Sequence, residues 1–274
     1  MASMTEADID HVISFVMANY GIDLSKKRTF VEVRTQKYMN RYGHANYSLC
    51  FASLCADVSG QAMAEFIGSL LVNFTSFYRE PMHFDFLLTT VLPQLNRQLG
   101  DNKTIYSWSA GCSTGEEPYT IAMVIQDYFN INKEHWDTKI LATDVSTFTL
   151  DKAKEAVYPY ESIAELPLSW INTYFTKDRE NKAQVSVAPM IRREVEFRKH
   201  NLVANDFTFK HKFHFIFCRN VMIYFNESTK KRLLDTFYDL LEDGGYLFIG
   251  TSERINAPSP YTYIKPSIYR KVVT

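Results

Sequence analysis

Two adjacent carboxylates, Glu116 and Glu117, directly follow a glycine-containing turn, and residues 108–119 read WSAGCSTGEEPY. This pattern is typical of a strand end, a tight turn and a helix start, where free backbone N–H groups can bind a ligand. Phosphate is disfavoured because the two carboxylates would repel it, and the segment has neither the G-x-G-x-x-G spacing nor a Walker lysine. A ligand with hydroxyls, a cationic centre and no phosphate, such as S-adenosylmethionine, fits the segment. An ordinary helix start, with acids that complement the dipole, explains it equally well.

Polar residues also stand at the ends of later strands, where doubly wound sheets bind their ligands. Asp144 ends the second predicted strand and is placed to accept hydrogen bonds from a ribose diol, although a helix N-cap explains it almost as well. It lies 33 positions after the first turn glycine, rather than about 20 as in dinucleotide sites, and a longer first helix would explain this. Asn201 and Leu202 follow one later strand, and Arg219 and Asn220 the next. Asparagines at two adjacent strand ends would suit an adenine edge and an amino-acid tail, although loop asparagines are more often turn formers.

The elements that position these residues belong to an α/β domain. After residue 86, short apolar runs alternate with amphipathic helices, as in a doubly wound, Rossmann-like parallel sheet. We expect strands at 105–108, 139–143, 195–199, 213–218 and 246–250, and helices at 117–129, 147–157 and from Asn226 or Ser228 to 241. The stretch 261–272, interrupted by Pro266, suits a strand pair at the sheet edge. Residues 81–274 should form this domain, with an inserted subdomain at about 158–193, where the alternation lapses.

Residues 1–80 predict a separate helical domain because they show no convincing period-two alternation. Thr5 is a suitable N-cap for the first helix, and Gly21 is well placed to end it. The second helix, residues 26–41, should bury three apolar residues, Phe30, Val33 and Met39. Three cations at i, i+3 and i+7 share one face of this helix: Arg34, Lys37 and Arg41. Most such stripes are merely solvated, and a docking face for an acidic partner is the functional alternative.

The composition of the chain argues against several classes of protein. Lys and Arg total 30 against 31 Asp and Glu, so no overall basic field indicates nucleic-acid binding. The cysteines Cys50, Cys55, Cys112 and Cys218 form no C-x-x-C pair, which argues against a zinc site or a disulfide framework and favours a reducing cytosol. No signal-peptide pattern opens the chain, and no apolar run reaches about 18 residues. We therefore expect a cytoplasmic monomer that binds no metal and does not insert into a membrane.

Three motifs together resemble one known family. Residues 73–79 read NFTSFYR, residues 113–119 read STGEEPY and residues 217–225 read FCRNVMIYF. In this order they closely resemble the chemotaxis receptor methyltransferases, the CheR family. The resemblance covers nearly the whole chain, including a helical N-terminal domain and an inserted three-stranded β-subdomain. It implies methyl transfer from S-adenosylmethionine to glutamate carboxylates of chemotaxis receptors, which gives methyl esters and S-adenosylhomocysteine for sensory adaptation in bacteria.

The resemblance also implies roles for individual residues. It implies cofactor contacts at nine positions: Asn73, Thr75, Arg79, Glu117, Asp144, Asn201, Leu202, Arg219 and Asn220. It leaves Glu116 as a partner of the helix dipole or of a residue that contacts the ligand. Arg79 and Tyr224 are the implied catalytic residues, and the Arg79 guanidinium could hold either the incoming carboxylate or that of the cofactor. The structural alternative for Arg79 is a salt bridge to Glu80 or to another residue of the domain. The structural alternative for Tyr224 is a place among the core aromatics.

The resemblance further implies a partner, the cytoplasmic domain of a methyl-accepting receptor. Arg34, Lys37 and Arg41 would contact its acidic methylation helices, with an affinity that falls as salt is added. Some family members also bind a receptor's C-terminal tether peptide through a glycine-containing turn of the β-subdomain. Residues 176–183, TKDRENKA, contain no glycine, so tether binding is left open. Two other functions stay open as well. The first is a small-molecule methyltransferase, and the basic helix argues against it. The second is a cofactor-binding scaffold without activity, and the presence of Arg79 and Tyr224 argues against that.

Overall fold

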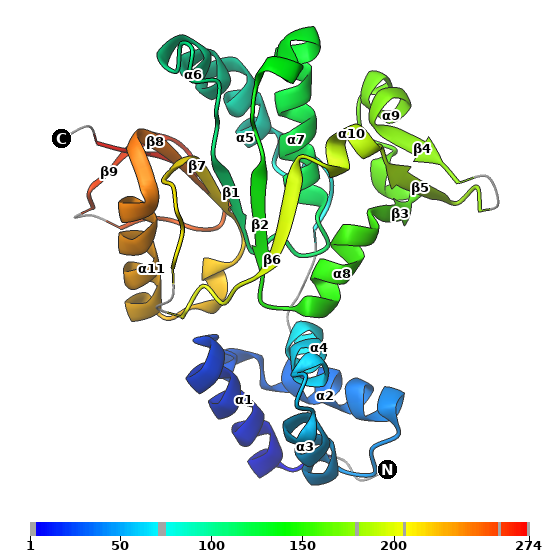
Figure 1. Cartoon of the computed structure of the whole chain (residues 1–274). Coiled ribbons are helices and arrows are strands. Elements are labelled where there is room, and N and C mark those ends of the chain that lie inside the picture. The colour runs from blue at the N-terminus through cyan, green and yellow to red at the C-terminus, as the bar shows by residue number, and fades with distance from the viewer. Residues whose placement is uncertain (1–3, 71–74, 179–180, 205–206, 257–258, 273–274) are drawn as a thin grey trace.

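The central element of the fold is a seven-stranded mixed sheet (Figure 1). The computed structural model describes residues 4–70, 75–178, 181–204, 207–256 and 259–272. From one edge to the other, the strands are β6 (Val195–Lys199), β2 (Ile140–Asp144), β1 (Ser107–Ala110), β7 (Phe213–Cys218), β8 (Leu241–Ile249), β10 (Ile268–Lys271) and β9 (Tyr261–Lys265). The first five run parallel, and β10 and β9 are added antiparallel. The predicted α/β class and the strand pair at the sheet edge are therefore confirmed.

Helices cover both faces of this sheet, because successive residues of each strand point to opposite sides. In β7, Phe215 and Phe217 belong to the apolar cluster that contains α5 and α7, whereas Ile216 and Cys218 belong to the cluster that contains α11. The helices of this domain are α5 (Pro81–Phe86), η2 (Leu87–Val91), α6 (Leu92–Gln98), α7 (Glu116–Phe129), η3 (Asn130–His135), α8 (Thr147–Glu155), η5 (Met222–Tyr224) and α11 (Glu227–Leu240). Asn226 caps α11 by accepting a hydrogen bond from the Thr229 N–H, as one of the two predicted alternatives requires. None of the described helices is long and apolar enough to cross a membrane.

Two strands begin at least two residues away from their predicted starts. Strand β1 begins at Ser107, two residues later than predicted. Strand β8 begins directly after α11, so that Gly244 and Gly245 lie within the strand and not in a connection before it. The β7–β8 register shifts between Phe213 and Phe215, opposite this part of β8. The two glycines therefore accommodate an irregularity in the ladder, a role that glycine also plays at bulges.

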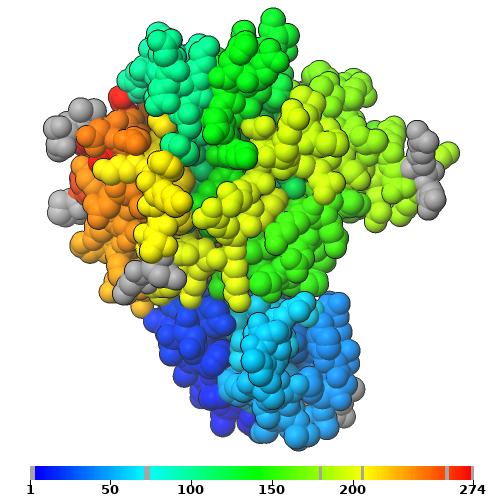
Figure 2. Space-filling view, in the orientation of Figure 1, coloured from blue at the N-terminus to red at the C-terminus, as the bar shows by residue number. Residues whose placement is uncertain are grey.

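The helical domain packs beneath the carboxyl ends of the parallel strands (Figures 1 and 2). It contains α1 (Glu6–Tyr20), η1 (Ser25–Lys27), α2 (Arg28–Tyr42), α3 (Tyr47–Ala56) and α4 (Gln61–Leu70). Thr5 caps α1 in a capping box, and Gly21 ends it in the left-handed conformation, as predicted. The predicted burial of Val33 is wrong, because 59% of the residue is exposed. The buried face of α2 instead follows i, i+4, i+7 and i+8, with Val31, Thr35, Tyr38 and Met39.

A small antiparallel sheet interrupts the α/β domain and projects from its side (Figure 1). Its strands are β3 (Val157–Pro159), β5 (Gln184–Val187) and β4 (Phe175–Lys177), with β5 in the middle. Three short helices accompany it: η4 (Tyr160–Ile163), α9 (Leu168–Tyr174) and α10 (Pro189–Arg192). Trp170 and Tyr174 are buried in the same apolar cluster as α7. This sheet is the predicted inserted subdomain.

Candidate functional site

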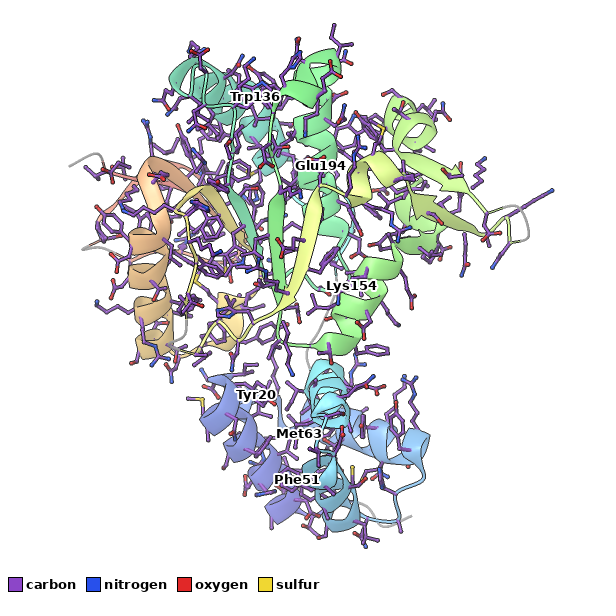
Figure 3. The ribbon with its side chains drawn as sticks, in the orientation of Figure 1. Tyr20, Phe51, Met63, Trp136, Lys154 and Glu194 are labelled. Atoms are coloured by element: carbon purple, nitrogen blue, oxygen red, sulfur yellow. The ribbon has the colours of Figure 1, made fainter. Side chains whose placement is uncertain are left out.

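A cavity of about 260 Å³ lies where the carboxyl ends of the strands meet the helical domain. Its walls contain nine of the predicted site residues: Thr75, Arg79, Glu117, Asp144, Asn201, Leu202, Arg219, Asn220 and Tyr224. Asn73 lies outside the described residues. The helical domain contributes Tyr20 and Ile22 to the wall. Figure 3 shows Tyr20 at the end of α1 that faces the sheet, whereas Trp136 and Glu194 lie toward the opposite end of the strands.

Asn201 and Asn220 do not stand on neighbouring strands, contrary to the sequence prediction. They follow β6 and β7, and the order β6-β2-β1-β7 puts two strands between them. From β1 the chain first adds β2 and β6 on one side, and then crosses to add β7 and β8 on the other side. The strand order therefore reverses between β1 and β7. Ligands of doubly wound sheets bind at such a reversal, so the two asparagines approach the cavity from different sides.

The turn after β1 forms one wall of the cavity and requires glycine at its first position. Gly111 has φ +85°, and a Cβ there would collide with the Val221 side chain. The N–H groups of Gly111 and Cys112 donate to the Thr143 carbonyl oxygen at 2.8 and 2.9 Å. Helix α7 then starts at Glu116, so the predicted order of strand, turn and helix is confirmed.

Asp144 ends β2 and supports this turn with its carboxylate. Its Oδ2 accepts a hydrogen bond from the Ser113 N–H at 2.9 Å, and its Oδ1 accepts one from the Ser146 N–H at 2.9 Å. The N-cap of α8 is Ser146, whose hydroxyl accepts from the Thr149 N–H, so Asp144 is not itself the cap. Burial raises the pKa of Asp144, against the lowering effect of these N–H donors. The long separation from Gly111 follows from α7 and the added η3.

Arg219 joins two carboxylates from distant parts of the chain beneath the cavity. Its Nη1 lies 3.0 Å from Glu117 Oε2 and its Nη2 lies 3.1 Å from Glu80 Oε2. Nη2 also donates to the Arg79 carbonyl oxygen, and only 2% of the Arg219 side chain is exposed. The guanidinium thus ties the end of β7 to α7 and to the segment between the two domains.

The two carboxylates bonded to Arg219 have opposite pKa shifts. Burial raises the pKa of Glu117, although Arg219 and the Ser109 hydroxyl, which donates at 2.7 Å, lower it in part. Burial also opposes ionisation of Glu80, but Arg219 and Thr251 together outweigh it and the pKa of Glu80 is lowered. Glu80 is hydrogen-bonded to Thr251 as well as to Arg219, so it has strong partners other than Arg79. Sequence reasoning treated Glu80 only as an alternative partner for Arg79 and missed this role.

His83 lies fully buried next to this network and is neutral at neutral pH. Burial, assisted by the charge of Arg219, lowers its pKa to about 4, and Glu80 only partly opposes that shift. Its Nδ1 lies 3.4 Å from Glu80 Oε2. Because the imidazole carries no charge near pH 7, this contact adds no second cation to the site. Arg219 therefore faces Glu80 and Glu117 as the cation of the network.

Tyr224 connects the cavity to the helical domain. Its carbonyl oxygen accepts a hydrogen bond from the Asp23 N–H at 2.7 Å, and Phe225 next to it pairs with Ile22 in an antiparallel bridge. The Lys27 ammonium lies 4.7 Å from the centre of the Tyr224 ring, within the range of a cation–π interaction. Tyr224 is partly buried against the apolar cluster that contains both α11 and the helical domain, and it also lines the cavity. No sequence pattern indicated this contact of Lys27, because Tyr224 lies almost two hundred positions away.

The cations of α2 lie outside the cavity, on the helical domain. Arg34 is half-buried with its guanidinium 5.1 Å from the centre of the Phe30 ring. Lys37 is exposed, and so is Arg41, whose Nη1 lies 3.7 Å from Glu65 Oε1. The Arg41 charge is thus partly compensated within the helical domain. Exposed Val33 adds an apolar surface to the same helix.

The cavity suits S-adenosylmethionine better than a nucleoside phosphate. Carboxylates of Glu117 and Asp144 line it, and burial raises the pKa of each, which indicates that a further negative charge would be costly here. A cationic ligand with ribose hydroxyls would offer these carboxylates both a charge and hydrogen-bond donors. Glu116 does not line the cavity; it is buried and accepts a hydrogen bond from the Thr114 hydroxyl at 2.7 Å.

Comparison with known proteins identifies a matching family. The family model described as CheR methyltransferase, SAM binding domain, matches residues 73–269. A chemotaxis protein methyltransferase of Borreliella burgdorferi is 38% identical over 272 residues, which cover 98% of this chain and 95% of that protein. A probable chemotaxis protein methyltransferase of Rhizobium etli is 31% identical over 90% of this chain and 92% of its own length. The chemotaxis protein methyltransferase of Escherichia coli is 32% identical over 93% of this chain and 86% of its own length.

Proposed function

The chain belongs to the CheR family and is an S-adenosylmethionine-dependent methyltransferase, and we propose that its methyl acceptors are glutamate side chains of chemotaxis receptors. The products would be glutamate methyl esters and S-adenosylhomocysteine, formed on the cytoplasmic domains of the receptors during sensory adaptation. The observation that carries this proposal is the position of Arg79 and Tyr224 in one cavity with Glu117 and Asp144. A cation and a phenol are the groups that a carboxylate acceptor would need beside the cofactor.

We assign the cofactor contacts to the walls of the cavity. Asp144 would accept hydrogen bonds from the ribose hydroxyls, and Asn201, Leu202 and Asn220 would bind the adenine and the methionine tail. Bound S-adenosylmethionine supplies an electrophilic methyl group on a sulfonium centre. The Arg219 guanidinium is already held by Glu80 and Glu117, so we assign it the role of positioning Glu117 and the Arg79 backbone. Thr75 and Asn73 belong to the interdomain segment and complete the proposed set.

The acceptor side of the reaction requires orientation more than acid–base chemistry. A glutamate has an ordinary pKa near 4.3, so it is ionised near pH 7 and needs no general base before it attacks the methyl carbon. Arg79 would bind one oxygen of that carboxylate or the carboxylate of the cofactor, and the Tyr224 hydroxyl would orient the attacking oxygen. Holding two reactants in line contributes about 7–11 kcal/mol in favourable model systems. We therefore expect positioning to account for most of the rate enhancement.

The exposed basic face of α2 is the proposed docking surface for the receptor. Arg34, Lys37 and Arg41 would attract an acidic receptor helix and fix its register. The segment between α1 and α2 is bonded to the Tyr224 loop through Asp23 and the Ile22–Phe225 bridge. A receptor that docks on α2 would thus be held at a fixed distance from Tyr224.

A transfer assay with methyl-labelled S-adenosylmethionine and receptor cytoplasmic fragments tests the proposal. The expected result is incorporation of label that base releases as methanol, because carboxylate methyl esters are base-labile. The Tyr224→Phe and Arg79→Met variants should lose most of the incorporation while S-adenosylhomocysteine binding to Tyr224→Phe is retained. Absence of base-labile label on every receptor fragment, from protein that binds S-adenosylhomocysteine, would remove receptor methylation as the function. Methylation of small molecules by the same preparation would then identify a different acceptor class.

A further inference from the structure

Glu253 is a buried carboxylate that no sequence motif singled out. It follows β8, beside Ser252 in the cavity wall, and only 7% of the residue is exposed. Its Oε2 accepts hydrogen bonds from the Gly250 N–H at 2.6 Å and from the Asn220 N–H at 3.0 Å. Its Oε1 accepts one from the Ile223 N–H at 3.1 Å. All three donors are backbone groups, and two of them belong to the loop between β7 and α11.

We propose that Glu253 is a positioning residue, whose carboxylate fixes the loop 219–225 and thereby holds Asn220 and Tyr224 in the wall of the cavity. The inference rests on the proposed function, because Asn220 and Tyr224 have roles only in that reaction. Glu253 itself does not line the cavity, so it acts on the reaction through this loop.

The backbone of the loop presents N–H groups that need acceptors from outside the loop. Asn220 has φ +58°, a conformation that non-glycine residues seldom adopt, and η5 is a single turn from Met222 to Tyr224. The first N–H groups of a helical turn have no partner within the turn and need an acceptor from elsewhere. Glu253 supplies that acceptor from the turn after β8. Asn tolerates the left-handed conformation better than most residues, which fits its place here.

The end of β8 is built to let the loop approach closely. A Cβ at Gly250 would collide with the Asn220 side chain and would lie 2.9 Å from Glu253 Oε2. Burial raises the pKa of Glu253, and the N–H groups of Gly250, Asn220 and Ile223 oppose that shift. The neighbouring Thr251 donates to Glu80 at 3.0 Å from its hydroxyl, so the same turn also contacts the interdomain segment. Residues 250–253 therefore join the two segments that carry Arg79 and Tyr224.

The Glu253→Gln variant tests the inference, with Glu242→Gln as the matched control. Glutamine keeps the shape of the side chain but replaces one acceptor oxygen with an NH₂ group, which would face backbone N–H donors. Glu242 is an exposed glutamate in the first part of β8, the strand that precedes Glu253. We expect kcat per folded enzyme to fall about 10- to 100-fold in Glu253→Gln, because small misplacements of reacting groups cost about that much. The receptor KM should change less than threefold, because the α2 surface is untouched.

Two further measurements separate positioning from general destabilisation. Amide hydrogen exchange in residues 219–225 should be at least tenfold faster in Glu253→Gln, with unchanged exchange in α1 and β5. The Glu253→Ala variant should be more severely affected than Glu253→Gln, and thermal melts give the folded fraction of each variant. A Glu253→Gln enzyme with kcat within twofold of the native value, or with unchanged exchange in 219–225, would overturn the inference. If the native chain methylates no receptor, the proposed function fails. The role of Glu253 is then still decided by two measurements, amide hydrogen exchange in residues 219–225 and the affinity for S-adenosylhomocysteine.

Discussion

The buried edge of the cavity and the exposed face of α2 use charge in opposite ways. Arg219, with 2% of its side chain exposed, is fixed by Glu80, Glu117 and the Arg79 carbonyl oxygen. The Arg41 side chain is 65% exposed, and its Nη1 lies 3.7 Å from the Glu65 carboxylate. Lys37 on the same helix is exposed as well. Charges out of water interact strongly and must be compensated, whereas exposed charges are screened by salt. The first set can hold a geometry and the second can attract a partner.

This difference suits the two tasks that the proposed reaction needs. The cofactor must be held in one orientation, so the residues around it are fixed by hydrogen bonds to the backbone and to each other. The receptor must bind and leave, and screened charges raise the rate of encounter without a large gain in residence time. The comparison predicts that substitutions at the buried edge alter stability and cofactor binding. Substitutions on α2 should alter only receptor kinetics and their salt dependence.

The largest effect is expected from Arg219→Met. The substitution leaves Glu80 and Glu117 buried without their cation, and breaking a buried pair in this way costs about 3–5 kcal/mol of unfolding free energy. Urea unfolding of the Arg219→Met variant measures the loss. The matched control is Arg198→Met, because Arg198 forms an exposed pair with Glu196 at 2.7 Å and should cost under about 1 kcal/mol. Equal losses in the two variants would contradict the distinction between buried and exposed charge.

A smaller effect is expected on cofactor binding in Asp144→Asn. A charged hydrogen bond to a ribose hydroxyl contributes about 1.5–3 kcal/mol, so S-adenosylhomocysteine affinity should fall about 10- to 100-fold at pH 7. Calorimetric titration of the native chain and the variant measures this. A change below threefold would argue against ribose binding at Asp144.

The same site predicts a pH dependence with a definite sign. Burial raises the pKa of Asp144 in the cofactor-free fold, so the carboxylate takes up its proton at a higher pH than an ordinary aspartate does. The ribose hydroxyls need the ionised form as acceptor. The affinity for S-adenosylhomocysteine should therefore reach its full value above the raised pKa of Asp144 and should decrease as the pH falls through that pKa. In Asp144→Asn this part of the pH dependence should be absent, which distinguishes Asp144 from the other acids of the site.

The sequence predicted the elements of the buried edge well, because their signals are local. A glycine turn followed by two acids marks the start of α7, and Asp144 marks the end of β2. The predicted catalytic and cofactor-binding residues that the structure describes all line one cavity, because the carboxyl ends of parallel strands meet at one edge. Their individual roles stay predictions.

The sequence could not predict the partners of these residues, since they come from distant positions. Glu80 lies 139 positions from Arg219, and nothing in its surroundings indicates a buried ion pair. Glu253 follows a strand and resembles any loop acid until its three N–H donors are seen. Val33 was predicted to be buried because it is apolar, yet the helix turns it outward while Thr35 fills the core. Tertiary contacts decided each of these cases.

The exposed face of α2 provides the next prediction, a change in the salt dependence of receptor methylation. In a variant with both Arg34→Glu and Lys37→Glu, kcat/KM for the receptor should fall about tenfold at low salt and by less at high salt, because ions screen these charges. S-adenosylhomocysteine affinity should stay unchanged. Lys103→Glu, an exposed charge reversal in the loop before β1, is the control. A double variant whose rate and salt slope match those of the control would show that the receptor docks elsewhere.

The smallest effect is expected at Lys27, which belongs to both regions. It is exposed on the helical domain, yet its ammonium lies over the Tyr224 ring at the cavity. An exposed cation–π interaction contributes about 0.5–1 kcal/mol, so Lys27→Met should lower kcat/KM for the receptor about two- to fivefold. The control is Lys26→Met, the exposed neighbour in the same turn. If Lys27 acts by attracting the receptor, as proposed for the cations of α2, the loss of kcat/KM in Lys27→Met should vanish at high salt. If Lys27 acts by holding the Tyr224 ring, the loss should persist. Equal rates in Lys27→Met and Lys26→Met would show that the contact between Lys27 and the Tyr224 ring contributes nothing to the reaction.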